Sequence, residues 1–388
     1  MAGVRKQRGR ILVFITEDWF ALSHFVPLLR ELTSLAGEVV LATRSSGCRE
    51  EIERLGMRVR PFDFHRGSLS IPKMLQVRAG LTRLIDQEKP DAVHAVAMQT
   101  MVMSSLALAR TTYRPSAVML HLTGLGYLGQ GRSPAARILR PLARAALRRC
   151  AATHNAWLLA ENDDDATTMV ASGVVARGRT EIIPGAGLDP AAFPQALPTG
   201  NIVPRAAFVG RMLSSKGVDV LVEAHRRLLA RDTPLDLALF GATDPGSRDA
   251  ISAEKLDTWQ RQAGLKWHGR TDDVAGVWRT SDIAVVPALG GDGMPRAMLE
   301  AAASGRPLIV SDVPGCRQFV RNGSEGFVVP PGDAEALARA LSRLAPDPKL
   351  RASFGQAARA RFMEGYTNDI VQARIRHAYE RALAGVSD

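Results

Sequence analysis

The chain alternates short apolar runs with longer amphipathic stretches, a pattern typical of strands and helices that follow one another around a parallel sheet. In the first half, six apolar runs are predicted to be strands: residues 11–15, 39–42, 92–96, 117–120, 157–160 and 181–183. Residues 25–35 place leucines at helical spacing on one face and are predicted to form a helix. The alternation predicts successive βαβ units.

A proline-rich stretch interrupts this pattern, with prolines at 184, 190, 194, 198 and 204. Proline disfavours both helix and central strand, so we place a linker at residues 186–205, after an N-terminal domain over 1–185. The pattern then restarts, with predicted strands at 206–209, 235–240, 265–267, 282–286, 307–310 and 326–329 and predicted helices at 219–229, 297–303 and 334–344. A second doubly wound domain is expected over 206–368, and a final helix over 369–388 that packs back toward the N-terminal domain.

Length and composition agree with two folded domains. The chain has 388 residues, of which 46% are hydrophobic and 23% charged, the balance of a globular protein. The net charge of +11 favours anionic partners such as nucleotides, phosphorylated lipids, acidic membranes or nucleic acids. Three widely spaced cysteines argue against a disulfide framework or a zinc site and favour a cytoplasmic compartment. We predict neither a secretory signal nor a membrane-spanning segment.

The segment 209–217, VGRMLSSKG, carries the first candidate chemistry. A predicted strand ends there, a glycine permits a close turn, and a helix begins near Gly217. Backbone N–H groups at a helix start bind phosphate, and Arg211 and Lys216 can add charge from either side of the turn. A solvated loop that happens to carry two charges is the alternative.

The segment 290–300, GGDGMPRAMLE, follows the next predicted strand. Its glycines allow close backbone approach to a ligand, and Pro295 stands at a predicted helix start. Asp292 before that helix and Glu300 within it can each accept hydrogen bonds from paired hydroxyls, which suits a sugar and a ribose. Alternatively, Asp292 is a helix cap and Glu300 a surface residue.

Here the sequence resembles a known family. The motifs VGRMLSSKG, LALFG, WHGRTDD, SDIAVVP, DGMPRAMLEAAASGRPLIVSDVPG and NGSEGFVVPPGD, in this order, resemble the family 4 retaining glycosyltransferases. In the first half, DWFALSHFVPLL, LTGLGYL, ENDDD and IIPGAGLDPAAF look like bacterial members that build lipid-linked glycans and polysaccharides. The resemblance implies an α/β protein of the GT-B fold, with two Rossmann-like doubly wound domains facing a central cleft.

The resemblance also implies a donor site. Arg211 and Lys216 match the pair that binds the donor diphosphate. Asp292 matches the first carboxylate of the family's paired-acid motif, and is our catalytic candidate beside the donor sugar. The remaining donor-binding positions are Glu300 for the ribose hydroxyls, Gly293, Met294 and Pro295 for backbone contacts, and Gly269 and Arg270 for the base-binding loop. The family usually has glutamate in place of Asp292, so the sugar contact or the preferred sugar is expected to differ.

Histidines compete for the remaining roles. His121 lies at the carboxyl end of the predicted strand 117–120, where the family has a histidine near the donor or the reacting centre, and we treat it as catalytic. A buried histidine bonded to the backbone is the alternative. His24, Thr123 and Gly124 are expected on the acceptor side, although the glycine-glycine loop of many members is absent near His24. His94 is interpreted as structural.

A run of arginines is the strongest partner signal. Arg137, Arg140, Arg144 and Arg148 recur at spacings of three and four, so they share one face of a predicted helix. A basic amphipathic helix can lie on anionic lipid, while an ordinary core helix with a solvated basic face is the alternative.

Together these features predict a retaining hexosyl- or N-acetylhexosaminyltransferase. The expected donor is a UDP-sugar, bound without a metal or other cofactor, and the expected acceptor is a polyprenyl-diphosphate-linked saccharide at the inner membrane face. A UDP-sugar 2-epimerase, a catalytically inactive scaffold and a basic nucleic-acid-binding protein are the alternatives. The last is disfavoured, because aromatic residues are only 5% of the chain and no nucleic-acid-binding motif occurs.

Overall fold

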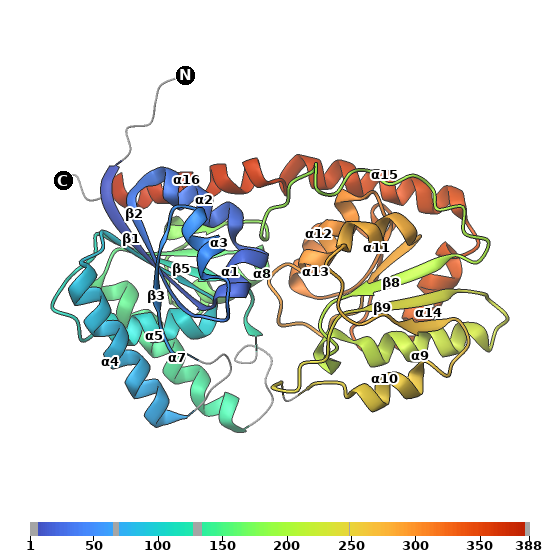
Figure 1. The fold of residues 1–388 in the computed structure, drawn as a ribbon, viewed down its shortest axis with the longest axis horizontal. Coiled ribbons are helices and arrows are strands. Elements are labelled where there is room, and N and C mark those ends of the chain that lie inside the picture. The colour runs from blue at the N-terminus through green and yellow to red at the C-terminus, as the bar shows by residue number, and fades with distance from the viewer. Residues whose placement is uncertain (1–6, 65–69, 127–133, 248, 385–388) are drawn as a thin grey trace, which may run out of the picture. The chain divides into compact units, whose positions relative to one another are not determined.

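The structure, a computed structural model, describes residues 7–64, 70–126, 134–247 and 249–384. The chain divides into two compact units, each built on one parallel sheet with helices on both faces (Figure 1). Unit 1 comprises Met1–Gly187, Gly291–Gly293 and Asn368–Asp388. Unit 2 comprises Leu188–Gly290 and Met294–Thr367. The short segment Gly291–Gly293 therefore clusters with unit 1, although it follows a strand of unit 2.

Within the described residues, the sheet of unit 1 has seven strands in the order β3-β2-β1-β4-β5-β6-β7. These are β1 (Gln7–Glu17), β2 (Ala36–Arg44), β3 (Arg58–Pro61), β4 (Ala92–Val96), β5 (Ala117–Leu122), β6 (Ala156–Ala160) and β7 (Thr180–Ile182). All neighbouring pairs are parallel. The strand order reverses between β1 and β4, which makes that point the switch point of the sheet.

Helices cover both faces of this sheet in unit 1 (Figure 1). On one face lie α4 (Ile71–Glu88), α5 (Met98–Leu108), α7 (Pro134–Thr153) and α8 (Asp163–Ala171). On the other lie α1 (Asp18–His24), α2 (Val26–Leu35), α3 (Arg49–Arg54) and α16 (Asn368–Ala384). The C-terminal α16 buries Val371, Ile375 and Tyr379 in the same apolar cluster as Val13 of β1. A one-turn helix, η1 (Arg177–Arg179), precedes β7.

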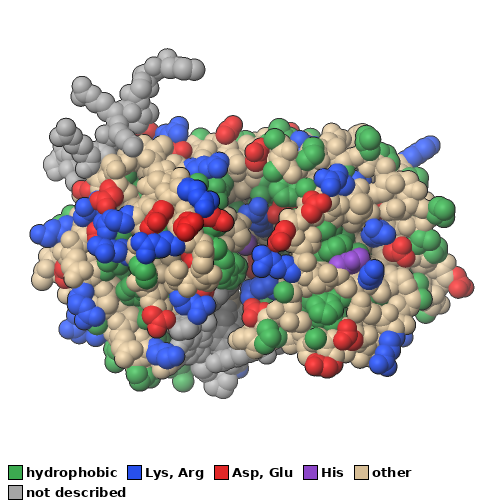
Figure 2. Space-filling model, viewed as in Figure 1, with side chains coloured by type: hydrophobic (Ala, Val, Ile, Leu, Met, Phe, Trp, Pro, Cys, Tyr) green, Lys and Arg blue, Asp and Glu red, His purple; other side chains and the backbone are tan. Residues whose placement is uncertain are grey.

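The edge strand β3 was not predicted. Its short sequence places Arg58 and Arg60 on either side of Val59, so it lacks an apolar run. Both arginines donate hydrogen bonds to the buried carboxylate of Glu88, and these bonds, that from Arg58 first, lower the pKa of Glu88 to about 2 although burial opposes the shift. Figure 2 shows basic side chains beside acidic ones over much of the visible surface. Charged side chains protect an exposed sheet edge from pairing with other chains.

Within the described residues, the sheet of unit 2 has six strands in the order β10-β9-β8-β11-β12-β13, all parallel. These are β8 (Arg205–Val209), β9 (Asp236–Phe240), β10 (Leu265–Trp267), β11 (Ile283–Val286), β12 (Leu308–Ser311) and β13 (Gly326–Val329). Every one lies within a residue or two of a predicted strand. The order reverses between β8 and β11, which places a second switch point there.

Helices also cover both faces in unit 2. One apolar cluster joins the sheet to α9 (Val218–Leu229), α10 (Ala253–Trp259) and α14 (Ala334–Leu344). The opposite cluster involves α11 (Val274–Thr280), α12 (Arg296–Ala303), α13 (Pro314–Phe319) and α15 (Pro348–Gly365). The predicted α/β class with two doubly wound domains is confirmed. Among the helices that the structure describes, none is both long enough and apolar enough to cross a bilayer.

Candidate functional site

The switch point of unit 2 brings together the two candidate motifs of the second half. After β8 the chain forms a short helical turn, η2 (Ser214–Lys216), and Gly217 has φ +71°. A Cβ atom at Gly217 would lie 1.9 Å from the carbonyl oxygen of Pro287, so only glycine fits. The Leu289 amide also donates to the Ser215 carbonyl over 2.9 Å. The turn carrying Lys216 therefore lies directly against the segment that follows β11.

Arg211 is already held by a carboxylate at this edge of the sheet. Its Nη1 donates to Oδ2 of Asp244 over 2.7 Å, and both side chains are about one-third exposed (38% and 34%). Such a half-exposed pair contributes at most about 1 kcal/mol to stability, so its main effect is to orient the guanidinium. Asp244 was missed by the sequence interpretation. Its position a few residues after the neighbouring strand β9 was the available signal.

Glu300 is buried on α12, which makes it more than a surface residue. Its carboxylate is 8% exposed and accepts a hydrogen bond from Nε of Arg296, one turn earlier, over 2.7 Å. A buried carboxylate needs such a partner. Pro295 caps the helix with φ −63°, and the Met294 side chain before it is buried. Arg296 was missed, although its spacing of four from Glu300 is typical of a helical ion pair.

The segment after β10 begins with the predicted base-binding residues. Gly269 has φ +70°, faces open space, and its carbonyl accepts from the Gly241 amide over 2.7 Å. Arg270 is 80% exposed and pairs with Asp272 at 3.3 Å. Just before them, the His268 ring stacks on Phe240 at 4.5 Å between centroids and 6° between planes. The stacked pair adds an aromatic surface beside the loop that sequence analysis did not assign.

In unit 1, the segment Gly291–Gly293 binds the loop after β5. The Gly293 amide donates to the Thr123 carbonyl over 3.0 Å, and the Gly126 amide donates to the Gly291 carbonyl over 3.1 Å. Gly124 has φ +108°, and a Cβ there would lie 2.3 Å from the Gly291 oxygen. The predicted acceptor-side residues Thr123 and Gly124 thus contact predicted donor residues on either side of Asp292.

Two residues at the end of β6 complete this contact. Asn162 caps α8, because its Oδ1 accepts from the Asp165 amide over 2.8 Å, as the motif ENDDD indicates. Its Nδ2 also donates to the Gly293 carbonyl over 2.8 Å. A Cβ at Gly293 would lie 2.3 Å from Oε2 of Glu161. Asparagine is a favoured helix cap, whereas nothing in the sequence indicates its second contact.

A buried pair of histidines lies beside the switch point of unit 1, on β4 and on the next strand, β5. His121 on β5 is 2% exposed and His94 on β4 is fully buried. Burial lowers the pKa of His121 to about 4 and lowers that of His94 well below its usual value. The Phe25 ring stands edge-on to His121 at 5.8 Å, and His24, directly before Phe25, is the last residue of α1. Both imidazoles are therefore neutral at physiological pH.

The four arginines of α7 that were predicted to share one helix face differ in their exposure and contacts. Arg137 and Arg144 are exposed, and Arg140 is half-buried. Nε of Arg148 donates to the Ser172 carbonyl over 2.6 Å. Ile138 and Leu142 are 65% and 62% exposed on the same helix. The exposed part of α7 is therefore both basic and apolar toward its N-terminal end.

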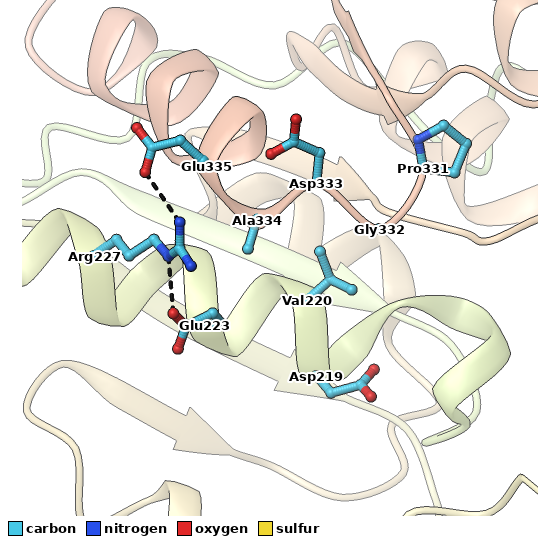
Figure 3. A pocket seen from close by; sticks show the side chains of 9 residues that line it. All are labelled: Asp219, Val220, Glu223, Arg227, Pro331, Gly332, Asp333, Ala334 and Glu335. Atoms are coloured by element: carbon cyan, nitrogen blue, oxygen red, sulfur yellow. Dashed lines mark hydrogen bonds and ion pairs between the residues drawn. The ribbon is translucent and has the colours of Figure 1, made fainter.

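A separate pocket of about 640 Å³ lies between α9 and α14 (Figure 3). Figure 3 shows Arg227 bridging Glu223 and Glu335 along its wall, with N–O distances of 2.8 and 3.2 Å. None of the predicted site residues lines it. Among the described residues, no three His, Cys, Asp or Glu side chains are grouped so that they could hold a metal ion.

The two doubly wound units fit the class of protein that two family models identify. A family model described as "Glycosyl transferase 4-like domain" matches residues 23–186. A second, "Glycosyl transferases group 1", matches residues 203–347. Together the two models span most of the chain. The chain belongs to the family 4 glycosyltransferases.

Individual relatives agree with this class. The chain is 32% identical over 202 residues to the phosphatidyl-myo-inositol mannosyltransferase of Mycolicibacterium smegmatis, covering 50% of each chain. It is 23% identical over 390 residues to the N,N'-diacetylbacillosaminyl-diphospho-undecaprenol alpha-1,3-N-acetylgalactosaminyltransferase of Campylobacter jejuni, covering 96% of this chain and 99% of the relative. The aligned regions span half or less of the length of the first curated relatives that the chain matches.

Solved structures show the same fold. The structure of Anabaena Alr3699/HepE in complex with UDP and glucose superposes with a TM-score of 0.77 at 16% identity. The match covers 96% of this chain and 100% of that chain. The predicted GT-B fold is confirmed.

Proposed function

We propose that this protein is a retaining glycosyltransferase that moves a sugar from a UDP-sugar to a polyprenyl-diphosphate-linked saccharide. The observation that carries the proposal is the meeting of Arg211, Lys216 and the segment after β11 at the switch point of unit 2. Parallel α/β sheets bind ligands at this place. The chain supplies there the positive charge that a diphosphate leaving group requires.

Each predicted donor residue has a role in this scheme. Arg211 and Lys216 neutralise the two phosphates, and the backbone of Gly293, Met294 and Pro295 lies along the donor. Glu300 accepts hydrogen bonds from the ribose hydroxyls, and Asp292 binds the transferred sugar. The base lies at Gly269 and Arg270, where the stacked His268 and Phe240 rings offer a flat aromatic surface.

The reaction breaks the bond between the sugar's anomeric carbon and the diphosphate oxygen. Positive charge then develops on the sugar ring while negative charge grows on the departing phosphate, which Arg211 and Lys216 stabilise. The acceptor hydroxyl attacks on the face that the phosphate leaves, and its proton passes to a departing phosphate oxygen. No protein nucleophile takes part, and the configuration at the anomeric carbon is retained.

The acceptor proposal follows from the relatives. The Campylobacter relative is named for an acceptor linked to diphospho-undecaprenol, and the mycobacterial one for a phosphatidylinositol lipid. An enzyme that uses such an acceptor works at a membrane surface. We assign His24 at the end of α1, and Thr123 and Gly124 after β5, to contact with the acceptor sugar.

A basic and apolar surface on unit 1 suits that location. On α7, the exposed Arg137 and Arg144 stand beside the exposed Ile138 and Leu142. A helix of this kind lies in the headgroup region of anionic bilayers. We therefore place α7 on the inner face of the cytoplasmic membrane.

Nucleotide binding tests the donor site. Thermal stabilisation is measured with UDP, GDP, ADP and CMP for the wild type, for Lys216→Ala and for the exposed control Lys349→Ala. We expect a UDP-selective shift that Lys216→Ala abolishes and Lys349→Ala preserves. Selectivity for GDP or ADP overturns the UDP donor but keeps the transferase. Absence of any shift argues against a nucleotide-sugar enzyme.

Vesicle binding tests the membrane surface. Co-sedimentation is compared between vesicles containing phosphatidylglycerol and vesicles of phosphatidylcholine alone, at low and physiological salt. Preference for the anionic vesicles, weakened by salt, is expected. Equal binding to both kinds overturns the electrostatic part of the proposal.

A further inference from the structure

We propose that Tyr379 and His94 are positioning residues that hold His121 in the tautomer whose Nε2 carries the hydrogen. His121 then serves as a hydrogen-bond donor to the donor sugar or its phosphate and cannot act as a base. The substrate part of this inference rests on the proposed function, whereas the tautomer itself does not.

The three side chains form one buried hydrogen-bonded chain within unit 1. Oη of Tyr379 lies 2.8 Å from Nδ1 of His94, and Nε2 of His94 lies 3.2 Å from Nδ1 of His121. The rings of Tyr379 and His94 stack at 5.9 Å. Tyr379 comes from the C-terminal helix α16, so residues 285 positions apart meet on the face of the sheet that α16 covers.

All three groups are uncharged at neutral pH. Burial lowers the pKa of both histidines and raises the pKa of the Tyr379 hydroxyl well above its usual value. Each imidazole therefore carries one N–H donor and one acceptor nitrogen, and the tyrosine keeps its proton. The direction in which hydrogen bonds are donated along these three side chains then follows from the number of donors and acceptors.

Two directions are possible. If Tyr379 donates to Nδ1 of His94, then Nε2 of His94 donates to Nδ1 of His121, and the hydrogen of His121 sits on Nε2. In the reverse direction, His121 donates to His94 and His94 donates to Tyr379. The Tyr379 hydroxyl hydrogen is then left without an acceptor, because His94 is its only hydrogen-bond partner among the described residues.

The first direction satisfies more buried groups. It leaves one polar atom unpaired, Nε2 of His121, whereas the reverse leaves both that nitrogen and the Tyr379 hydrogen unpaired. Nε2 of His121 is buried and has no hydrogen-bond partner in the part of the chain that the structure describes. An unpaired buried donor is costly, and one found at a site is explained when a ligand supplies its partner.

The backbone around His121 is also strained. Ala97, directly after β4, has φ +77° and ψ 154°, a conformation rarely adopted by residues other than glycine. Its amide donates to the carbonyl oxygen of His121 over 2.8 Å. Strained backbone of this kind concentrates at functional sites. The strained backbone therefore lies beside His121, whose Nε2 has no hydrogen-bond partner among the described residues.

The tautomer decides what His121 can do chemically. A neutral imidazole with hydrogen on Nε2 has no lone pair there, so it cannot take the proton of the acceptor hydroxyl. It can donate to a sugar hydroxyl or to a phosphate oxygen on which charge grows. The proton of the acceptor must leave by another route, which agrees with its transfer to the departing phosphate.

Nitrogen-15 NMR of histidine-labelled protein tests the tautomer without any substrate. Two-bond correlations distinguish a protonated Nε2 from an unprotonated one, and His121→Gln identifies the signals of His121. In the wild type, we expect Nε2 of His121 to be protonated and Nδ1 unprotonated. The opposite assignment overturns the proposal whether or not the protein is a glycosyltransferase.

Tyr379→Phe removes the donor that sets the direction. We expect the His121 signals to move toward a mixture of tautomers, and the control Tyr113→Phe, on the same unit, to leave them unchanged. Unchanged His121 signals in Tyr379→Phe overturn the role of Tyr379. Because the wild-type spectrum already tests the tautomer, a Tyr379→Phe variant that fails to fold does not remove the test.

Kinetics then test the consequence for catalysis. Tyr379→Phe should lower kcat about tenfold with the KM for the donor nearly unchanged, the scale of losing a hydrogen bond that orients a reactive group. His121→Gln keeps an N–H donor, so it should retain more activity than His121→Ala and lose nothing further when Tyr379→Phe is added. Further loss in that double variant overturns the mechanism. If the wild type transfers no sugar at all, the proposed function fails while the NMR result still stands.

Discussion

The two switch points occupy the same place in two sheets but differ in their chemistry. In unit 2 the side chains are charged and partly exposed, as Arg211 and its partner Asp244 show. In unit 1 they are neutral and buried, because desolvation keeps His94 and His121 uncharged. One topological position therefore presents fixed charge in one unit and a neutral hydrogen-bond donor in the other.

This difference matches the demands of the proposed reaction. The diphosphate is negatively charged before the bond breaks and gains further charge as it leaves, so permanently charged groups such as Arg211, oriented by Asp244, suit it. The reacting sugar gains charge only briefly, so the group beside it must be oriented before the reaction begins. Burial and a hydrogen-bonded chain provide that orientation for His121. The comparison leads to four predictions, given from the largest expected effect to the smallest.

Removing the positive charge of Arg211 at the switch point of unit 2 should have the largest effect on catalysis. Arg211→Ala is expected to lower kcat/KM about 10²- to 10³-fold, because a donor to the developing charge is lost. Steady-state assays with a UDP-sugar measure this. The matched control is Arg279→Ala, another ion-paired arginine of unit 2, which should remain within twofold of the wild type. A loss below threefold for Arg211→Ala contradicts its assignment to the diphosphate.

Acid should destabilise the neutral site of unit 1. Below pH 6.5, His121 is protonated in the unfolded chain. In the folded chain the pKa of His121 is about 4, so the imidazole stays neutral until the pH falls to about that value. The free energy of unfolding therefore falls as the pH drops from about 6.5 to 4, by about 3 kcal/mol from this residue. Urea denaturation across this range measures the slope. His121→Gln should flatten it relative to the surface control His377→Gln, and equal slopes in both variants contradict burial of a neutral His121.

Weakening the ribose contact should have a moderate effect. Glu300→Gln is expected to raise the KM for the donor about tenfold with little change in kcat, because the ribose is bound equally in the ground and transition states. Glu335→Gln alters a similarly ion-paired glutamate in the separate pocket of unit 2 and serves as the control. If Glu335→Gln has the larger effect on KM, the pocket between α9 and α14 is the nucleotide site instead.

The smallest expected effect is on membrane binding by the exposed arginines of α7, on the surface of unit 1. Arg144→Ser on α7 should weaken binding to anionic vesicles about fivefold, since each arginine near the surface contributes about 1 kcal/mol. Arg179→Ser changes an exposed arginine of the same unit outside α7, and should bind as the wild type does. An equal loss in both variants indicates a general charge effect without a defined face.

Much of the fold was predictable from the sequence because it depends on local patterns. Buried parallel strands are mostly apolar runs, so β4 and β13 were predicted with the bounds that the structure has. The edge strand β3 escaped because its stability comes from arginines that bind Glu88, a residue far along the chain. Strand recognition therefore failed only where the stabilising contact is distant in sequence.

The candidate site divides in the same way. The sequence by itself determined which residues carry charge and which turns need glycine, so Arg211, Lys216, Asp292 and Glu300 were recognisable from their motifs. Only the tertiary structure decided that Asp244 holds Arg211, that Asn162 binds Gly293, and that Tyr379 reaches His94. The physical reason is the distance along the sequence over which each property is determined. Charge and backbone conformation belong to a residue and its neighbours, whereas burial and hydrogen-bond direction exist only once distant segments have packed together.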